Sequence, residues 1–250
     1  MSIIYNWLKR VIFGVYGLWV WLVFIVFGSA VTLTLVILPG ISARRKLTRS
    51  GAIISLALSG LRPRIKGLEL LPDEPGVVVA NHASYLDGIV MTAVLPARFQ
   101  YVVKQEMSSV PGAGYMLKRL GTQFVSRAHA QSSAGGARRI MKAAKNQQSI
   151  VFFPEGTFVA EPGLKKFHSG AFISAASGGM PITPIIIHGT RRILPAQQWL
   201  ARPGRIDVIL KPAHRIGADA EDAKQLKLLC RQSILAELNE PDTAQSKLLQ

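Results

Sequence analysis

A long apolar run near the N-terminus constrains the fold more than any other feature of this sequence. No charged residue occurs between Arg10 and Arg44, and the core of that gap, Val11–Leu38, is almost wholly apolar. As a helix this core extends about 42 Å, at ~1.5 Å per residue, whereas about 20 residues cross a bilayer core. A secretory signal peptide has a shorter apolar region. The run therefore predicts an N-terminal hydrophobic helical membrane anchor.

The mode of attachment stays open, because basic residues flank the run on both sides. Lys9 and Arg10 precede it, and four basic residues follow it: Arg44, Arg45, Lys46 and Arg49. A bias of basic residues to one flank normally orients a spanning helix. A second, weaker apolar stretch, Ala52–Leu61, ends before Pro63. The sequence predicts an anchor over residues 1–63 that is either one spanning helix or two helices dipping into one leaflet.

The charge balance indicates an acidic partner. Lys and Arg total 30 against 14 Asp and Glu, a formal net charge of +16. Nucleic acid, an anionic membrane, and an acidic substrate or carrier all fit such a charge. Aromatic residues gather in the apolar N-terminus, whereas a nucleic-acid platform interleaves them with basic residues. We therefore expect anionic membrane lipid as a partner and no nucleic acid.

Cysteine and histidine usage argues against a metal centre. The chain has one cysteine, Cys230, so neither an intramolecular disulfide nor a cysteine-rich metal site is possible. No pair of its five histidines has metal-ligand spacing. We expect no metal, and we expect Cys230 to be a packing residue on a helix.

From about residue 64 the pattern becomes that of an α/β domain, which we expect to cover residues 64–250. Short β-branched or aromatic runs alternate with longer helical segments, which predicts a mostly parallel (mixed) sheet covered by helices. The expected strands are Val77–Ala80, Gln100–Lys104, Thr122–Val125, Ser149–Phe153, Thr183–Ile187 and Ile206–Leu210. The expected helices are Leu86–Leu95, Tyr115–Leu120, Gln131–Asn146, Ala171–Ser177 and Glu221–Leu238.

A polar cluster follows the first of these strands, where open α/β sheets place their chemistry. Asn81, His82, Ser84 and Asp87 form the pattern Asn-His-x-Ser-x-x-Asp. With four residues between them, the chain can turn back so that Asp87 accepts a hydrogen bond from His82. A carboxylate on one imidazole nitrogen leaves the other as a proton acceptor. The cluster therefore predicts activation of a hydroxyl group.

Four ordered motifs resemble those of the glycerolipid acyltransferase family, which includes 1-acylglycerol-3-phosphate acyltransferases. The His–Asp cluster is similar to the first motif of that family. Three further segments are similar to the second, third and fourth motifs: Gly121–Arg127, Phe153–Thr157 and Pro181–Pro184. Lys104 and Pro111 also fall where the family often carries them. The resemblance covers Ile65 to about Lys211.

The resemblance implies an enzyme that transfers a fatty acyl group to the free hydroxyl of 1-acylglycerol-3-phosphate and forms phosphatidic acid in phospholipid synthesis. The acyl donor is acyl-CoA or acyl carrier protein, and the acceptor is a lysophospholipid. His82 acts as the general base and Asp87 orients it, with no cofactor. The implied substrate-binding residues are Lys104, Arg127, Glu155, Gly156 and Thr157. Asn81, Ser84 and Pro154 support the motifs.

Two of these roles also have a chemical basis. Arginine offers a planar fork that suits phosphate, and we expect Arg127 at the end of a short strand, with Lys104 facing the same crevice. The backbone N–H of Gly156 is the candidate donor to the oxyanion that forms during acyl transfer.

One departure from the family pattern leaves the acceptor open. The family often continues Glu-Gly-Thr with Arg-Ser, whereas this chain has Phe158-Val159. Lys165, Lys166 or Arg192 could replace the missing phosphate ligand, or the acceptor is another lysolipid. A lipid hydrolase with Ser84 as the nucleophile and a non-catalytic membrane-binding protein are two competing functions for the chain. The expected location is the inner (cytoplasmic) membrane, with the catalytic domain on the cytoplasmic side.

Overall fold

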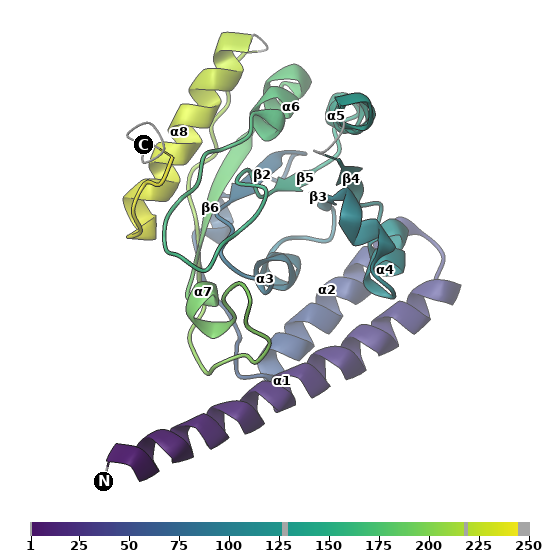
Figure 1. Cartoon of the computed structure of the whole chain (residues 1–250). Helices are drawn as coiled ribbons and strands as arrows, with labels where there is room; N and C mark the ends of the chain where they lie inside the picture. Colours follow the sequence, from purple (N-terminus) through teal and green to yellow (C-terminus); the bar gives the residue numbers. More distant parts are fainter. Residues whose placement is uncertain (1, 127–129, 218–219, 245–250) are drawn as a thin grey trace.

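The chain folds into a seven-stranded sheet between two layers of helices, with a long helix at its base (Figure 1). This computed structural model describes residues 2–126, 130–217 and 220–244. The helices and strands are α1 (Ser2–Ile37), α2 (Ile41–Leu58), β1 (Arg64–Lys66), η1 (Leu68–Leu70), β2 (Val77–Ala80), α3 (Asp87–Val94), β3 (Gln100–Lys104), η2 (Gln105–Ser109), α4 (Ala113–Arg119), β4 (Gln123–Val125), α5 (Ala130–Lys145), β5 (Ile150–Phe152), α6 (Gly170–Gly178), β6 (Ile182–His188), α7 (Thr190–Ile193), β7 (Asp207–Leu210) and α8 (Ala220–Leu238).

The sheet is mixed, with the strand order β1-β7-β6-β2-β5-β3-β4. All neighbouring strands are parallel except β6 and β7, which pair antiparallel. The predicted α/β fold with a mostly parallel sheet is therefore confirmed. Strand β1 was not predicted, because Arg64, Ile65 and Lys66 are all exposed and show no apolar pattern.

Strand β2 lies inside the sheet and is buried on both faces. Successive side chains of a strand point to opposite faces. Val77 and Val79 accordingly join one core cluster, whereas Val78 and Ala80 join the other. This is why the strand reads as an unbroken apolar run rather than an alternating one.

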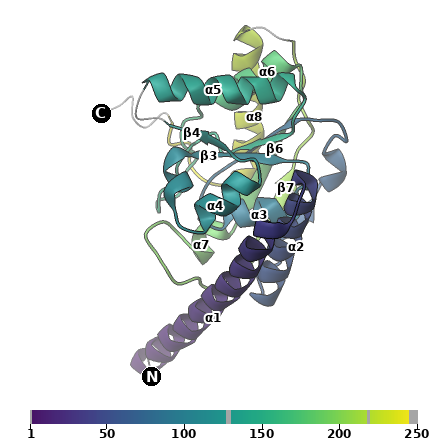
Figure 2. The same cartoon turned by 90° about the vertical axis from the view of Figure 1, so that its right-hand side faces the viewer.

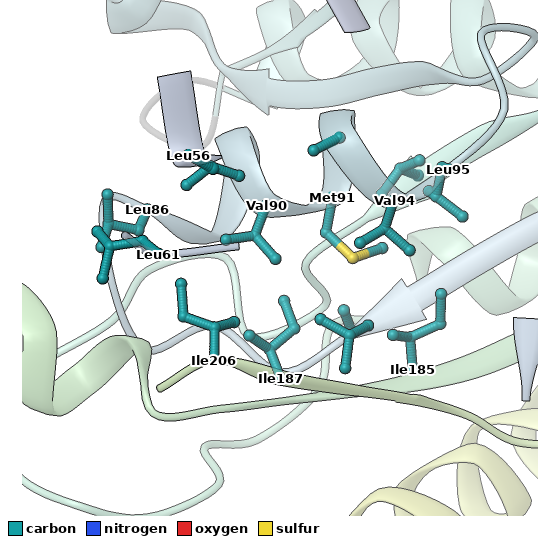
Figure 3. Close-up of a cluster of buried hydrophobic side chains, with 14 of the residues drawn as sticks. Leu56, Leu61, Leu86, Val90, Met91, Val94, Leu95, Ile185, Ile187 and Ile206 are labelled. Atoms are coloured by element: carbon teal, nitrogen blue, oxygen red, sulfur yellow. The ribbon is translucent and has the colours of Figure 1, made fainter. Parts of the chain in front are cut away.

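Helix α3, with α2 behind it, covers one face of the sheet. Figure 3 shows Val90 and Met91 of α3 meeting Ile185 and Ile187 of β6, with Leu56 of α2 on the far side of α3. Helices α5, α6 and α8 cover the opposite face (Figure 1). Cys230 of α8 is fully buried in that layer, as a packing residue should be, and burial raises the pKa of its thiol to about 12.

All of the predicted apolar run except its last residue, Leu38, lies within α1. This helix packs beside α2 at the base of the domain and projects its N-terminal end beyond it (Figure 2). The helices approach closely where a Cβ on Gly51 would lie 2.7 Å from a methyl carbon of Val31. Among the described residues, α1 is the one helix whose length and hydropathy suit a membrane span, over Tyr5–Ile37. Only 22% of its most apolar window is buried.

The position at which an anchor and a catalytic domain divide stays a prediction. Helix α2 ends at Leu58 and β1 begins at Arg64, close to the expected division at residue 63. However, Leu56 and Leu61 are buried in the same core cluster as α3 and the sheet. Val20 of α1 belongs to the same cluster, so both α1 and α2 are packed against the domain as well as adjacent to it in sequence.

Candidate active site

The His–Asp cluster lies where β2 ends, and Asn81 fixes that end against β6. The side chain of Asn81 is buried and makes two hydrogen bonds with the backbone of Ile187. Its amide nitrogen donates to the carbonyl oxygen at 3.0 Å, and its amide oxygen accepts from the N–H at 2.8 Å. These two side-chain bonds continue the hydrogen bonding between β2 and β6 at the point where the backbone turns out of the sheet. Asn81 is therefore a structural support for the motif.

Asp87 organises the turn that carries His82. One carboxylate oxygen, Oδ2, accepts from the Nδ1 of His82 at 2.9 Å and from the backbone N–H groups of Ala83 and Ser84 at 2.7 and 2.8 Å. Asp87 is fully buried and is the first residue of α3, where the helix dipole favours a negative charge. The bond to Nδ1 holds the proton on that nitrogen and leaves Nε2 as the acceptor.

Aromatic rings surround the imidazole. The ring of Phe153 stacks on His82 with centroids 4.4 Å apart, and the ring of Phe158 meets it edge-on at 4.6 Å. Tyr85 packs against Phe158 in turn, at 4.8 Å. The side chain of His82 keeps 19% of its surface exposed. Phe158, which stands where the family often has an arginine, therefore places an aromatic ring in direct contact with the imidazole.

Ser84 is engaged elsewhere. Its hydroxyl donates to the carbonyl oxygen of Leu194 at 2.6 Å and accepts from the N–H of Leu86 at 3.1 Å. The side chain is fully buried. This arrangement does not support Ser84 as the nucleophile of a hydrolase, because its proton points away from His82.

Glu155 joins the third motif to the first. Its two oxygens accept from the backbone N–H groups of His82 at 2.7 Å and of Lys165 at 2.8 Å. Only 3% of its surface is exposed, and burial raises the pKa of its carboxyl to about 7. These contacts position the backbone around His82, and substrate binding by Glu155 stays a prediction.

The other residues of the third motif form a tight turn. Gly156 has a φ of 74°, which glycine adopts without strain, and its N–H donates to the carbonyl oxygen of Phe153 at 2.9 Å. The carbonyl oxygen of Pro154 accepts from the N–H of His168 at 2.8 Å. Because the Gly156 N–H already has an acceptor, this structure does not offer it to an oxyanion. Thr157 is partly buried beside the turn.

Lys104 lies at the same edge of the sheet as His82. It is the last residue of β3 and is exposed, and the parallel register sets it beside Val125, the last residue of β4. Arg127, the other predicted phosphate ligand, lies outside the described residues. Lys166 and Arg192, suggested as replacements for the missing arginine, are exposed, and Lys165 is partly buried.

Arg191 is a residue of the site that the sequence did not suggest. Its guanidinium donates to the carbonyl oxygens of Val159 at 2.7 Å and Glu161 at 2.8 Å, and it forms a two-pronged ion pair with Glu240 at 3.1 and 3.0 Å. It thus holds the segment that follows Phe158. No sequence pattern indicates this role, because two acceptors are backbone groups and the carboxylate is 49 residues away.

No group of three or more His, Cys, Asp or Glu side chains in the described part of the chain could hold a metal ion. The site contains the imidazole of His82, which is held through Nδ1 by the buried carboxylate of Asp87 and contacts the rings of Phe153 and Phe158. Its Nε2 is the nitrogen left to accept a proton. Such an arrangement can take a proton from a hydroxyl group.

Comparison with known proteins gives concordant results. A family model described as Acyltransferase matches residues 62–188. A chloroplastic 1-acyl-sn-glycerol-3-phosphate acyltransferase of Arabidopsis thaliana is 35% identical over 159 residues, 62% of this chain and 44% of that protein. A 1-acyl-sn-glycerol-3-phosphate acyltransferase of Neisseria gonorrhoeae is 31% identical over 176 residues, 68% of this chain and 67% of that protein.

A solved structure shares the fold. The crystal structure of the 1-acyl-sn-glycerophosphate (LPA) acyltransferase of Thermotoga maritima matches with a TM-score of 0.73 and 20% sequence identity. The match covers 92% of this chain and 96% of that one. The sequence match to the Arabidopsis thaliana protein, by contrast, spans less than half of that protein's length.

Proposed function

This chain belongs to the acyltransferase family, as its motifs predicted, and on that basis we propose that it transfers a fatty acyl group from an acyl thioester to the free hydroxyl of 1-acylglycerol-3-phosphate, which yields phosphatidic acid. The observation that carries the proposal is the 2.9 Å contact between Nδ1 of His82 and the buried carboxylate of Asp87. The names of the relatives support the choice of acceptor.

The reaction needs one base and no protein nucleophile. Nε2 of His82 takes the proton of the acceptor hydroxyl while the hydroxyl oxygen attacks the thioester carbonyl carbon. The resulting tetrahedral intermediate expels the thiolate as the C–S bond breaks, and the imidazolium returns its proton to that sulfur. A positioned general base contributes about 10²–10⁴-fold to such a rate. Asp87 favours the imidazolium in the transition state because its negative charge lies beside it.

The acceptor is the finer part of the proposal. A phosphate group requires cations near His82, and Lys104 at the edge of the sheet and Arg127 are the candidates. Phe158, beside the imidazole, specifically favours the alternative that another lysolipid with a less anionic headgroup is the better acceptor. Both acyl-CoA and acyl carrier protein remain candidate donors, because both are acidic and carry the same thioester.

Attachment to one leaflet fits α1 better than a span does. From Tyr16 onward α1 is held against the domain, since the Tyr16 hydroxyl donates to the carbonyl oxygen of Ser59 at 2.7 Å and Arg119 donates to that of Leu35 at 2.6 Å. The residues before Tyr16 extend only about 21 Å as a helix, less than the ~30 Å hydrocarbon core. The proposal is therefore a two-helix attachment to the leaflet that faces the domain, on the cytoplasmic side of the inner membrane.

A matrix of substrates tests the function. The purified chain in phosphatidylcholine–phosphatidylglycerol vesicles is given each of several lysolipids with either acyl-CoA or acyl carrier protein, and free thiol and acylated product are measured. We expect thiol release only when an acceptor and a donor are both present, with 1-acylglycerol-3-phosphate among the accepted lysolipids. Thiol release without an acceptor would indicate a hydrolase, and no turnover with any pair would contradict the proposal.

A further inference from the structure

Residues 194–205, which form nearly all of the loop between α7 and β7, carry the most exposed tryptophan of the described chain. Trp199 has 78% of its surface exposed and Leu200 has 42%. The loop is closed at its base, where the N–H of Arg202 donates to the carbonyl oxygen of Ile193 at 2.9 Å. The tip of the loop therefore has a fixed base and exposes two large apolar side chains, Trp199 and Leu200.

The loop is packed on α1. A Cβ on Gly17 would lie 2.8 Å from the Cβ of Leu200 and 3.1 Å from the carbonyl oxygen of Ala201, so the absence of a side chain at Gly17 permits the contact. The indole N–H of Trp21 also donates to the carbonyl oxygen of Trp199. Figure 1 shows the loop that follows α7 reaching α1. Residues almost 180 positions apart thus share one surface.

This shared surface is apolar and bordered by positive charge. Leu18 and Leu22, which follow Gly17 and Trp21 on α1, are both exposed. The loop sequence LPAQQWLARPGR contains no acidic residue, and its two arginines, Arg202 and Arg205, are exposed. Tryptophan beside arginine is the composition of a protein surface at the boundary between lipid headgroups and acyl chains.

The base of the loop is joined to the catalytic cluster. Leu194, its first residue, accepts the hydrogen bond from the buried hydroxyl of Ser84 at 2.6 Å. Ser84 lies two residues from His82, and its N–H donates to Asp87. Leu194, Ser84 and Asp87 therefore connect the loop to the imidazole through hydrogen bonds, so contact of the loop with a membrane would fix the position of His82 relative to that membrane.

We propose that the 194–205 loop is a second membrane contact, in which Trp199 and Leu200 insert into an anionic leaflet beside α1 and set the distance between His82 and the lipid surface. The partner is a lipid surface rather than a protein, because the tip continues the apolar face of α1 and the only charged residues within the loop are Arg202 and Arg205. This inference rests on the proposed attachment of α1 to one leaflet.

Fluorescence quenching tests the insertion directly. In the full-length chain Trp7 and Trp19 are changed to Phe and Trp21 to His, which keeps a ring N–H for the carbonyl oxygen of Trp199, so that Trp199 is the one fluorophore. The protein is mixed with phosphatidylcholine–phosphatidylglycerol vesicles whose acyl chains carry bromine near the headgroup. In the matched control Trp199 is also changed to Phe, and Leu228→Trp places the fluorophore on an exposed position of α8, in the opposite helical layer.

We expect brominated lipid to quench Trp199, and its emission to shift to shorter wavelength, while the Leu228→Trp control is unaffected. Cosedimentation with the vesicles reports attachment through α1 separately, and thiol release in detergent micelles reports the proposed reaction separately. Vesicle-bound protein whose Trp199 is not quenched would overturn the inference, whatever its activity.

A double variant tests the contribution to binding. Trp199→Ser with Leu200→Ser is expected to weaken partition into vesicles about tenfold, to raise the apparent KM for vesicle-borne acceptor, and to leave turnover in detergent micelles unchanged. The thermal unfolding of the variant reports whether the fold is intact. An unchanged partition and an unchanged KM would contradict the inference.

Discussion

At the scale of single residues, the site depends on one buried carboxylate oxygen that accepts three hydrogen bonds. Oδ2 of Asp87 holds the imidazole of His82 and the two N–H groups that follow it. The carboxylate of Asp87 therefore fixes both the orientation of the His82 imidazole and the conformation of the turn that follows it. Glu155 acts on His82 through the backbone, because its carboxylate accepts from the N–H of His82.

Changing Asp87 to Asn should lower the rate of acyl transfer by about 10²–10⁴-fold, because the amide no longer holds the proton on Nδ1 or stabilises the imidazolium. The measurement is kcat for thiol release with saturating substrates. Circular dichroism and thermal unfolding serve as the controls for folding. A variant that folds normally and retains the wild-type kcat would show that the contact is only structural.

Glu155 should make the stability of the protein depend on pH. Its carboxyl has an ordinary pKa of 4.5, whereas burial raises the pKa to about 7 in the folded state. The folded state therefore favours the protonated form, so this contribution to stability is present below pH 4.5 and is lost as the pH rises through 7. The loss amounts to at most about 3 kcal/mol.

Urea unfolding of the wild type and of Glu155→Gln between pH 5 and 8 measures this contribution. The difference between the two free energies of unfolding should change with pH in that window, because only the wild type has the carboxyl that titrates. Parallel curves for the two proteins would contradict the assignment.

The sequence predicted the contacts of the site that join residues close to one another in the chain. His82 and Asp87 are five residues apart at the end of an apolar strand, so their pairing follows from a single turn. The roles of Glu155 and Gly156 were harder to foresee, because their partners are backbone groups of residues such as Lys165 and Phe153. Sequence patterns report side-chain types, and they say little about which backbone groups are already hydrogen-bonded.

At the scale of helices and strands, the segment that carries Phe158 is held by a clamp from the C-terminal region. Arg191 binds the carbonyl oxygens of Val159 and Glu161 and pairs with Glu240. Nearby, the N–H of Leu164 donates to the carbonyl oxygen of Pro241. The segment after α8 thus supports one wall of the active site.

Arg191→Leu should therefore raise the KM for the acceptor several-fold and make the segment from Val159 to Gly163 more sensitive to proteases, because three acceptors lose their donor. Steady-state kinetics and limited proteolysis check both effects. Arg215→Leu, which removes an exposed ion pair with Glu74, is the matched control and should change neither. Equal behaviour of the two variants would contradict the role of the clamp.

The strands that the sequence predicted are those with an apolar run, such as β2 and β3, whose bounds agree with the prediction. Short elements without such a run were missed. Strand β1 is exposed and owes its place to pairing with β7, and α7 is a single turn of four residues between β6 and the loop. Neither has a pattern long enough to distinguish it from a connection.

At the scale of the whole molecule, the domain, the two N-terminal helices and the 194–205 loop form one continuous body. Arg119 of α4 donates to the last carbonyl groups of α1, while the loop contacts α1 near Gly17. The sequence could not decide between one span and two helices in a leaflet, because that choice depends on contacts between α1 and distant segments.

The net charge of +16 should make membrane binding sensitive to salt and to lipid charge. Binding to vesicles with phosphatidylglycerol should weaken as salt rises from about 0.1 to about 1 M, because the screening length falls from about 10 to about 3 Å. Binding to phosphatidylcholine alone should be weaker and nearly independent of salt. Cosedimentation measures both, and equal binding to the two lipids would contradict an electrostatic contribution.

The most direct test of His82 as the general base is the rate of acyl transfer after His82→Ala. Thiol release in the presence of lysolipid and acyl donor should fall by about 10²–10⁴-fold, while vesicle binding stays unchanged and a cooperative thermal unfolding transition shows that the variant is folded. His214→Ala, which alters a partly buried histidine at the far end of β6, should keep the wild-type rate. A folded His82→Ala variant with the wild-type rate would contradict the proposed mechanism.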